Sequence, residues 1–342
     1  MEWFENVARY ANMEPLQFAY SLLSGSQRIG HANLKLRDAR FIDKIETSLA
    51  SKCGGVALPS APMFLPFQLR AMQLINRVVV SPMAQYRAVD GVPTDWHLVH
   101  YGARATGGAG LVFTEMTCTS ADARISPGCT GLWNETQVAA WRRIVEFVHG
   151  ESPARICLQL GHAGRKGSTQ LGWQEADQPL SHGNWPLCAP SPLPYLPGIS
   201  QVPQEMTPAQ MESVKRDFVR SATLGAAAGF DMLELHMAHG YLLASFLSPL
   251  TNVRNDEFGG TVQNRLRFPL QVLGAVRAVW PAEKPLSVRI SACDWADGGL
   301  SEADVIDIAK AMAAAGADIL DISSGQTVAT QQPVYGRMWQ TP

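Results

Sequence analysis

Two nine-residue stretches, AAGFDMLEL (227–235) and AAGADILDI (314–322), repeat one pattern and limit what the fold can be. GGAGLVFTE (107–115) is a looser third copy. In each stretch an apolar helix is predicted to end at a glycine, because a left-handed cap residue favours glycine, and a strand follows directly. Strands as uniformly apolar as these are typical of parallel sheets that are covered on both faces. The repeat therefore predicts one strand-and-helix unit used several times.

Six β-rich runs are predicted from residue 76 onward: NRVVVSPM (76–83), GLVFTEMT (110–117), ARICLQLGH (154–162), DMLELH (231–236), PLSVRIS (285–291) and DILDIS (318–323). Helical spacing separates them, in TQVAAWRRIVEFVHG (136–150), TPAQMESVKRDFVRSATLGAAAG (207–229) and SEADVIDIAKAMAAAG (301–316). This alternation indicates parallel strands joined by right-handed crossovers.

Two architectures fit the alternation, a doubly wound open sheet and a (β/α)8 TIM barrel. The open sheet would favour a GxGxxG turn after its first strand, and AQYRAVDGVPTDWH (84–97) supplies none. Polar residues instead gather at predicted strand ends, as a barrel builds its site: Gln159, His162, His236, Arg289 and Ser323. We expect an α/β protein with a (β/α)8 barrel that is truncated after about six strands.

The first 50 residues differ from the rest, with a helical pattern and no strand signal. SKCGGVALPSAP (51–62) is typical of a linker. We therefore expect a helical segment over 1–50, a linker over 51–62 and a barrel domain over 63–342, incomplete at its C-terminal end.

The composition indicates an ordinary globular protein. The 342 residues are 46% hydrophobic and 17% charged, with a formal charge of −2, which gives no basic surface for nucleic acid or an acidic membrane. No apolar run is long enough to span a bilayer, and the acidic N-terminus does not resemble a signal peptide. Six scattered cysteines favour reduced thiols over a zinc site or disulfides. We expect a cytoplasmic protein with a small-molecule substrate and a possible homo-oligomer.

His236 and His239 lie three residues apart where an apolar strand ends. A zinc site would require a helix and further ligands, which HMAH lacks. Two interpretations stay open: hydrogen-bonded structural histidines, or two neutral imidazole N–H groups that polarise a substrate carbonyl. Tyr241 would then add a phenol able to deliver a proton.

Gln159 and Arg289 are predicted to emerge from the third and fifth strands. An amide and a guanidinium facing one pocket suit the imide edge of a flavin, where arginine near N1 stabilises the reduced anion. The alternative is a structural arginine paired with Glu115, Asp294 or Asp321.

Four segments together resemble the Old Yellow Enzyme family of FMN-dependent ene-reductases: SPMAQYRAVDGVPTDWHLVHYGARATGGAGLVFTE, LQLGHAGRKG, ELHMAHGYLLASFLSPLTNVRNDEFGGTVQNRLRFPLQVL and VRISACDW. The resemblance covers about residues 63–325 in order. It implies a (β/α)8 barrel that binds FMN at the C-terminal ends of its strands. NADH or NADPH reduces the flavin, which passes hydride to the β-carbon of an activated alkene.

The resemblance also implies site residues. Along the flavin it places Pro82, Met83, Ala84, Met116, Gln159 and Arg289. On the substrate it places His236, His239, Tyr86 and the proton donor Tyr241. Two positions depart from relatives: Ala84 stands where many carry a cysteine or threonine that tunes the flavin potential. Lys166 stands where relatives of the 2,4-dienoyl-CoA reductase type carry a tyrosine acid.

The linker and the stretches LQLGHAGRKGSTQLGW and SSGQTVATQQPVYGRMWQTP are similar to a narrower group. These are the reductase halves of the bifunctional salicylyl-CoA 5-hydroxylase and 2-aminobenzoyl-CoA monooxygenase/reductase proteins. Residues 1–50 would then resemble the tail of a flavin monooxygenase, and both ends of the chain would be cuts. The expected substrate is an activated C=C of an aromatic acyl-CoA derivative. The alternatives are a general enone or xenobiotic reductase, and an inactive truncated fragment that binds FMN poorly because strands seven and eight, which typically hold the phosphate, are missing.

Overall fold

The computed structural model describes residue 44, residues 47–48, residue 51 and residues 62–333. The predicted helical segment over 1–50 and the linker over 51–62 lie almost wholly outside these residues, so that division of the chain stays a prediction. None of the described helices combines the length and the apolarity that crossing a membrane requires.

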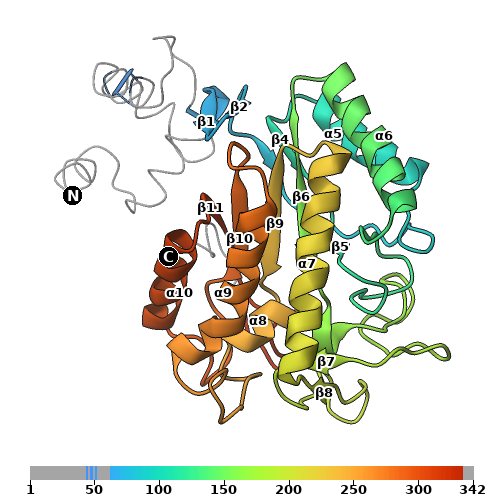
Figure 1. Cartoon of the computed structure of the whole chain (residues 1–342), viewed down its shortest axis with the longest axis vertical. Helices are drawn as coiled ribbons and strands as arrows, with labels where there is room; N and C mark the ends of the chain where they lie inside the picture. Colours follow the sequence, from blue (N-terminus) through green and yellow to red (C-terminus); the bar gives the residue numbers. More distant parts are fainter. Residues whose placement is uncertain (1–43, 45–46, 49–50, 52–61, 334–342) are drawn as a thin grey trace.

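A curved parallel sheet forms the centre of the described chain (Figure 1). Its order is β11-β10-β9-β6-β4-β3, with the short β5 beside β6, and every pair is parallel. The bounds are β3 (Val79–Val80), β4 (Leu111–Phe113), β5 (Thr117–Cys118), β6 (Arg155–Gly161), β9 (Met232–Met237), β10 (Leu286–Ser291) and β11 (Ile319–Ser323). The six predicted runs are confirmed as strands in this fold of the (β/α)8 TIM-barrel type, although the first is two residues long instead of eight.

Helices connect the strands and cover the outer face of the sheet (Figure 1). They are α5 (Asp95–Thr106), α6 (Glu135–Glu151), α7 (Pro208–Ala228), α8 (Leu242–Leu247), α9 (Val262–Val279) and α10 (Glu302–Ala314). The glycines of the repeated pattern adopt the left-handed conformation that was predicted, with φ of 97° at Gly108, 98° at Gly229 and 106° at Gly316. Each glycine turns the chain from a helix into the next strand without the steric cost of a Cβ.

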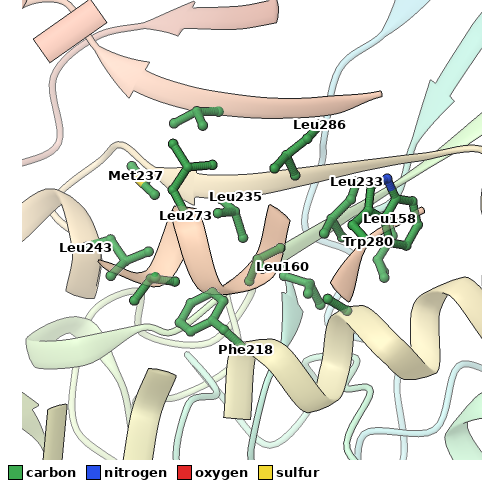
Figure 2. Close-up of a cluster of buried hydrophobic side chains, with 14 of the residues drawn as sticks. Leu158, Leu160, Phe218, Leu233, Leu235, Met237, Leu243, Leu273, Trp280 and Leu286 are labelled. Carbon is green, nitrogen blue, oxygen red and sulfur yellow. The ribbon is translucent and has the colours of Figure 1, made fainter. Parts of the chain in front are cut away.

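Successive side chains of each strand alternate between two environments. Those of Leu158, Leu160, Leu233, Leu235 and Leu286 point outward, where they pack against residues of the helices such as Phe218 and Leu273 (Figure 2). The alternate residues of the same strands point to the inside of the barrel, because side chains of a strand have a period of two. Gln159, Glu234 and Ser287 lie side by side there, and His236, Arg289 and Asp321 form the next level.

Two features of the fold were not predicted. An antiparallel hairpin of β1 (Phe67–Leu69) and β2 (Met72–Leu74) packs against the N-terminal end of the barrel interior. At the opposite end, residues 167–206 between β6 and α7 form an excursion that contains β7 (Cys188–Ala189) and β8 (Gln204–Glu205) (Figure 1). We call residues 167–206 the cap segment.

A cavity of about 370 Å³ lies on the inner face of the sheet, between the hairpin and the two outermost strands. Its lining is mostly apolar and includes Met72, Leu111, Phe113, Met232 and Ile319. Among the described residues β3 and β11 each have one unpaired edge. The cavity lies toward the N-terminal ends of the strands, whereas barrels of this kind carry their chemistry at the C-terminal ends.

Candidate active site

His236, His239 and Tyr241 converge at the C-terminal end of β9. The imidazole centroids lie 5.0 Å apart, and the Tyr241 ring lies 4.9 Å from that of His236, each pair nearly perpendicular. The backbone makes this possible: β9 ends, His239 takes a left-handed φ of 61°, and Tyr241 caps α8. The chain therefore turns back within three residues, which brings side chains from a strand end and a helix start together.

Hydrogen bonds fix the orientation of both imidazoles. His236 Nδ1 accepts the backbone N–H of Ala238 at 3.2 Å, which leaves its proton on Nε2. His239 Nε2 lies 2.6 Å from the Ser323 hydroxyl, and Ser291 accepts the backbone N–H of His239 at 3.0 Å. Strand-end residues of β10 and β11 thus hold the second histidine. In the tautomer in which the Ser323 hydroxyl donates to Nε2, the His239 proton is on Nδ1.

Both histidines are neutral at physiological pH. Burial lowers the pKa of His236 well below its usual value, and the nearby His239, Arg289 and Lys166 add to this effect. Burial lowers the pKa of His239 to about 3, and the positive charges of Arg289 and Lys166 contribute to this shift. Each ring therefore offers one N–H donor without a positive charge.

Two tyrosines keep their protons in the same region. Burial raises the pKa of Tyr241 well above its usual value, and the neighbouring Tyr86 adds to the effect. Burial likewise raises the pKa of Tyr86, which has a left-handed φ of 53°. Both rings pack against a small buried cluster that includes Met116 and Cys118. Protonated phenols beside neutral imidazoles form a group of uncharged hydrogen-bond donors.

Gln159 lies inside the barrel, held by a buried carboxyl group. Its Nε2 donates to Glu234 Oε1 at 2.8 Å, and Glu234 Oε2 accepts from the Ser287 hydroxyl at 2.6 Å. Burial raises the pKa of Glu234 to about 8, with the Asp321 charge as the next cause. The Glu234 contact orients the Gln159 amide, because a carboxyl oxygen accepts only from its N–H side.

Arg289 lies on the next level of the barrel interior, above Gln159 and Glu234. Its Nε lies 3.4 Å from Asp321 Oδ2, which is an ion-pair distance. Asp321 is one of the three partners that the structural interpretation of Arg289 proposed. Glu115 and Asp294 bind elsewhere: Glu115 lies 2.9 Å from His97, and Asp294 accepts from Ser248 and Thr327. The ion pair does not satisfy the guanidinium, since its buried Nε has no hydrogen-bond partner among the described residues.

The loop after β3 carries Pro82, Met83, Ala84 and Tyr86 at the same edge of the sheet. Glu115 Oε2 accepts the backbone N–H of Gln85 at 2.8 Å, which ties this loop to the end of β4. Met83 is 42% exposed, so the loop borders an open surface. The structure thus brings all the predicted site residues to the C-terminal edge of the barrel.

Gly161 allows Met116 and His236 to approach each other. A Cβ at Gly161 would lie 2.5 Å from Met116 Sδ and 3.3 Å from His236 Cβ. His162, the next strand-end residue, is buried away from this set, with its Nε2 3.9 Å from Cys188 Sγ.

Sequence reasoning missed two buried groups at the site. Glu234 gave a signal, because it is a carboxylate inside the apolar run DMLELH. Lys166 was noted only as a departure from relatives. Its Nζ donates to the carbonyls of His239 and Gln326, lies 5.2 Å from the Tyr241 ring, and burial lowers its pKa to about 8.

The residues present fit a flavin. An oriented amide, a buried guanidinium N–H without a partner among the described residues and the half-buried to exposed residues 82–84 match the polar edge and flat face of an isoalloxazine. A barrel with such a site belongs to the class of flavin-dependent oxidoreductases.

The comparison with known proteins agrees with this class. The chain belongs to the NADH:flavin oxidoreductase / NADH oxidase family, whose model matches residues 62–341. It is 40% identical over 275 residues to an NADPH dehydrogenase of Bacillus cytotoxicus, covering 80% of this chain and 74% of that one.

Solved structures show the same similarity. Morphinone reductase in complex with tetrahydroNAD has a TM-score of 0.64 at 31% identity, covering 76% of this chain and 73% of that one. An Old Yellow Enzyme from a Pichia species has a TM-score of 0.60 at 33% identity, covering 69% and 60%. The TIM-barrel fold, the oxidoreductase class and the use of FMN with NADH or NADPH are thereby confirmed for the family of this chain.

Proposed function

We propose that the protein reduces a C=C bond conjugated to a carbonyl group, as an ene-reductase. The observation that carries this proposal is the pairing of two neutral imidazole N–H donors with a protonated phenol, Tyr241. A carbonyl oxygen accepts from both imidazoles, and negative charge that develops on it is stabilised by fixed donors. An imidazolium is not required, so the arrangement works at neutral pH.

Bound FMN would supply the hydride chemistry of this reaction, with NADH or NADPH as the reductant and the β-carbon of the substrate as the acceptor. In this proposal Gln159 and Arg289 hold its polar edge, while Pro82, Met83, Ala84 and Met116 border its ring. His236 and His239 bind and orient the substrate oxygen, and Tyr86 borders the substrate. Tyr241 gives its phenolic proton to the α-carbon, which completes the addition of two hydrogens across the double bond.

Replacing both histidines tests the substrate role. In H236A/H239A the reduced enzyme should be reoxidised by 2-cyclohexenone about 100-fold more slowly or worse, because two donors to the developing charge are lost. Flavin content should stay as in the parent, since neither imidazole is assigned to the cofactor. Stopped-flow absorbance of the flavin measures both quantities. Unchanged reoxidation would remove the pair from the substrate site.

We further propose an aromatic acyl-CoA derivative as the substrate, on the resemblance of LQLGHAGRKGSTQLGW and neighbouring stretches to the bifunctional acyl-CoA proteins. The competing candidate is a general enone reductase. The ratio of kcat/KM for a dearomatised acyl-CoA to that for 2-cyclohexenone separates the two. A thioester preference supports the first, and equal or reversed values support the second.

A further inference from the structure

The guanidinium of Arg87 lies over two exposed indole rings at the mouth of the candidate active site. Its guanidinium carbon is 5.1 Å from the Trp96 ring centroid and 4.5 Å from that of Trp173. The two tryptophans are 52% and 53% exposed, although large aromatic side chains are normally buried. The stack joins the loop after β3, the first turn of α5 and the cap segment.

Neighbouring contacts hold this stack in place. Trp96 Nε1 donates to Gln85 Oε1 at 3.0 Å, and Gln85 Nε2 donates to the Met83 carbonyl at 2.8 Å. On the other side, the Trp173 ring meets the Tyr86 ring edge-on, with centroids 6.4 Å apart. The stack is therefore ordered before any ligand arrives, and it begins directly outside Tyr86.

The side chain of Arg87 keeps its hydrogen-bonding capacity unused among the described residues. Two other arginines also meet an aromatic ring of the cap segment, but both have hydrogen-bond partners: Arg124 donates to the Ala121 carbonyl and Arg165 to that of Leu193. The guanidinium of Arg87 has no hydrogen bond or ion pair with another described residue. A guanidinium held over aromatic rings can still donate from its N–H groups, which suit a phosphate.

We propose that Arg87, Trp96 and Trp173 form a subsite for the phosphorylated adenosine end of a nucleotide ligand. An adenine ring can stack on the outward face of an exposed indole, while a phosphate binds the edge of the guanidinium. This inference rests on the proposed function, because two ligands of that reaction carry such an end. They are a coenzyme A thioester, with a 3′-phosphate, and NADPH, with a 2′-phosphate.

The test is direct binding of nucleotide fragments to the purified chain by isothermal titration calorimetry. Adenosine 3′,5′-bisphosphate represents coenzyme A and adenosine 2′,5′-bisphosphate represents NADPH. R87Q should weaken binding of the preferred fragment about tenfold, which is what the loss of one charge-assisted contact gives. W173A should weaken it as well. R216Q, a matched change at an exposed arginine of α7, should alter the Kd less than twofold.

The two fragments identify the source of the adenosine. Tighter binding of the 3′-phosphate isomer assigns the subsite to a coenzyme A thioester, and tighter binding of the 2′-phosphate isomer assigns it to NADPH. Failure of both to bind, or equal Kd values for the parent and R87Q, would overturn the inference. Turnover of 2-cyclohexenone, which has no nucleotide, is measured in parallel. Its absence would count against the proposed function and leave the calorimetric result to decide the subsite alone.

Discussion

Glu234 is fully buried between Gln159 and Ser287. Ionisation of its carboxyl group is therefore costly. Its pKa is raised from 4.5 to about 8, chiefly by burial. The folded protein therefore keeps the proton over a pH range in which the unfolded chain releases it. Each unit of such a difference corresponds to about 1.4 kcal/mol. Glu234 stabilises the fold fully below about pH 4.5, and this contribution is lost as the pH rises toward about 8.

The variant E234Q should remove this dependence. An amide has nearly the shape of the carboxyl group and can still accept from Gln159, but it cannot ionise. We expect urea unfolding to show nearly equal stability of parent and E234Q near pH 5, and a more stable variant near pH 8. E212Q, at an exposed position of α7, serves as control and should follow the parent throughout. A constant difference between parent and E234Q across the range would contradict the protonated state.

Tyr241 is expected to be the proton donor, with its own pH signature. Y241F should slow reoxidation of the reduced enzyme by 2-cyclohexenone about 100-fold, the usual effect of losing a general acid. In the parent the rate should be flat between pH 5 and 7, because the pKa of His239 is about 3, that of His236 is also lowered and that of Tyr241 is raised. Stopped-flow traces at several pH values measure this. A rate that changes with an apparent pKa between 6 and 7 would show that an imidazole ionises during turnover.

At the scale of elements, β6 must end in a residue without a side chain. G161A should displace Met116 and His236, since the added Cβ would lie 2.5 Å from Met116 Sδ, and should reduce both flavin content and enone turnover. G274A is the matched control in α9, where a Cβ meets nothing within 4 Å. It should stabilise the protein by about 1 kcal/mol through helix propensity alone. Thermal unfolding and flavin absorbance distinguish the two, and normal flavin content in G161A would show that the approach is not needed.

The sequence was sufficient for the elements whose signal is local. The strands β6, β9, β10 and β11 and the helices α7 and α10 follow from apolar runs that end at glycine or polar residues. The first strand was predicted too long, because NRVVVSPM is apolar throughout while only Val79 and Val80 pair with β4. The hairpin of β1 and β2 escaped prediction, since three-residue strands leave little periodicity.

The site was predictable in part for a related reason. His236, His239 and Tyr241 lie close in sequence, so a strand end brings them together without knowledge of the tertiary structure. The partners that orient the site residues come from other strands. Ser323 binds His239 across 84 residues, and Glu234 binds Gln159 across 75. Such contacts depend on strand order and register, which one sequence does not specify.

At the scale of the whole molecule, the described residues leave the inner face of the sheet open between its two outermost strands. The cavity there is lined by Leu111, Phe113, Met232 and Ile319, of which Ile319 is 41% exposed, and an apolar lining that opens to solvent binds apolar dyes or a second molecule. We expect the 342-residue chain expressed alone to enhance the fluorescence of a hydrophobic dye and to self-associate at rising concentration. Sizing with light scattering measures the second effect. I319S, which makes the exposed part of the lining polar, should reduce both, and a monomer that leaves the dye dark would contradict this expectation.

The alternation of side chains along β6, β9 and β10 also restricts how such a protein can evolve. An inserted or deleted residue in any of these strands would exchange the leucines of the outer layer with the polar groups inside, and so would destroy stability and chemistry together. The cap segment carries no such restriction, because its residues reach the mouth from outside the sheet. Related proteins can therefore differ in the length and sequence of residues 167–206, and so in the ligands that they bind, while the reaction stays the same.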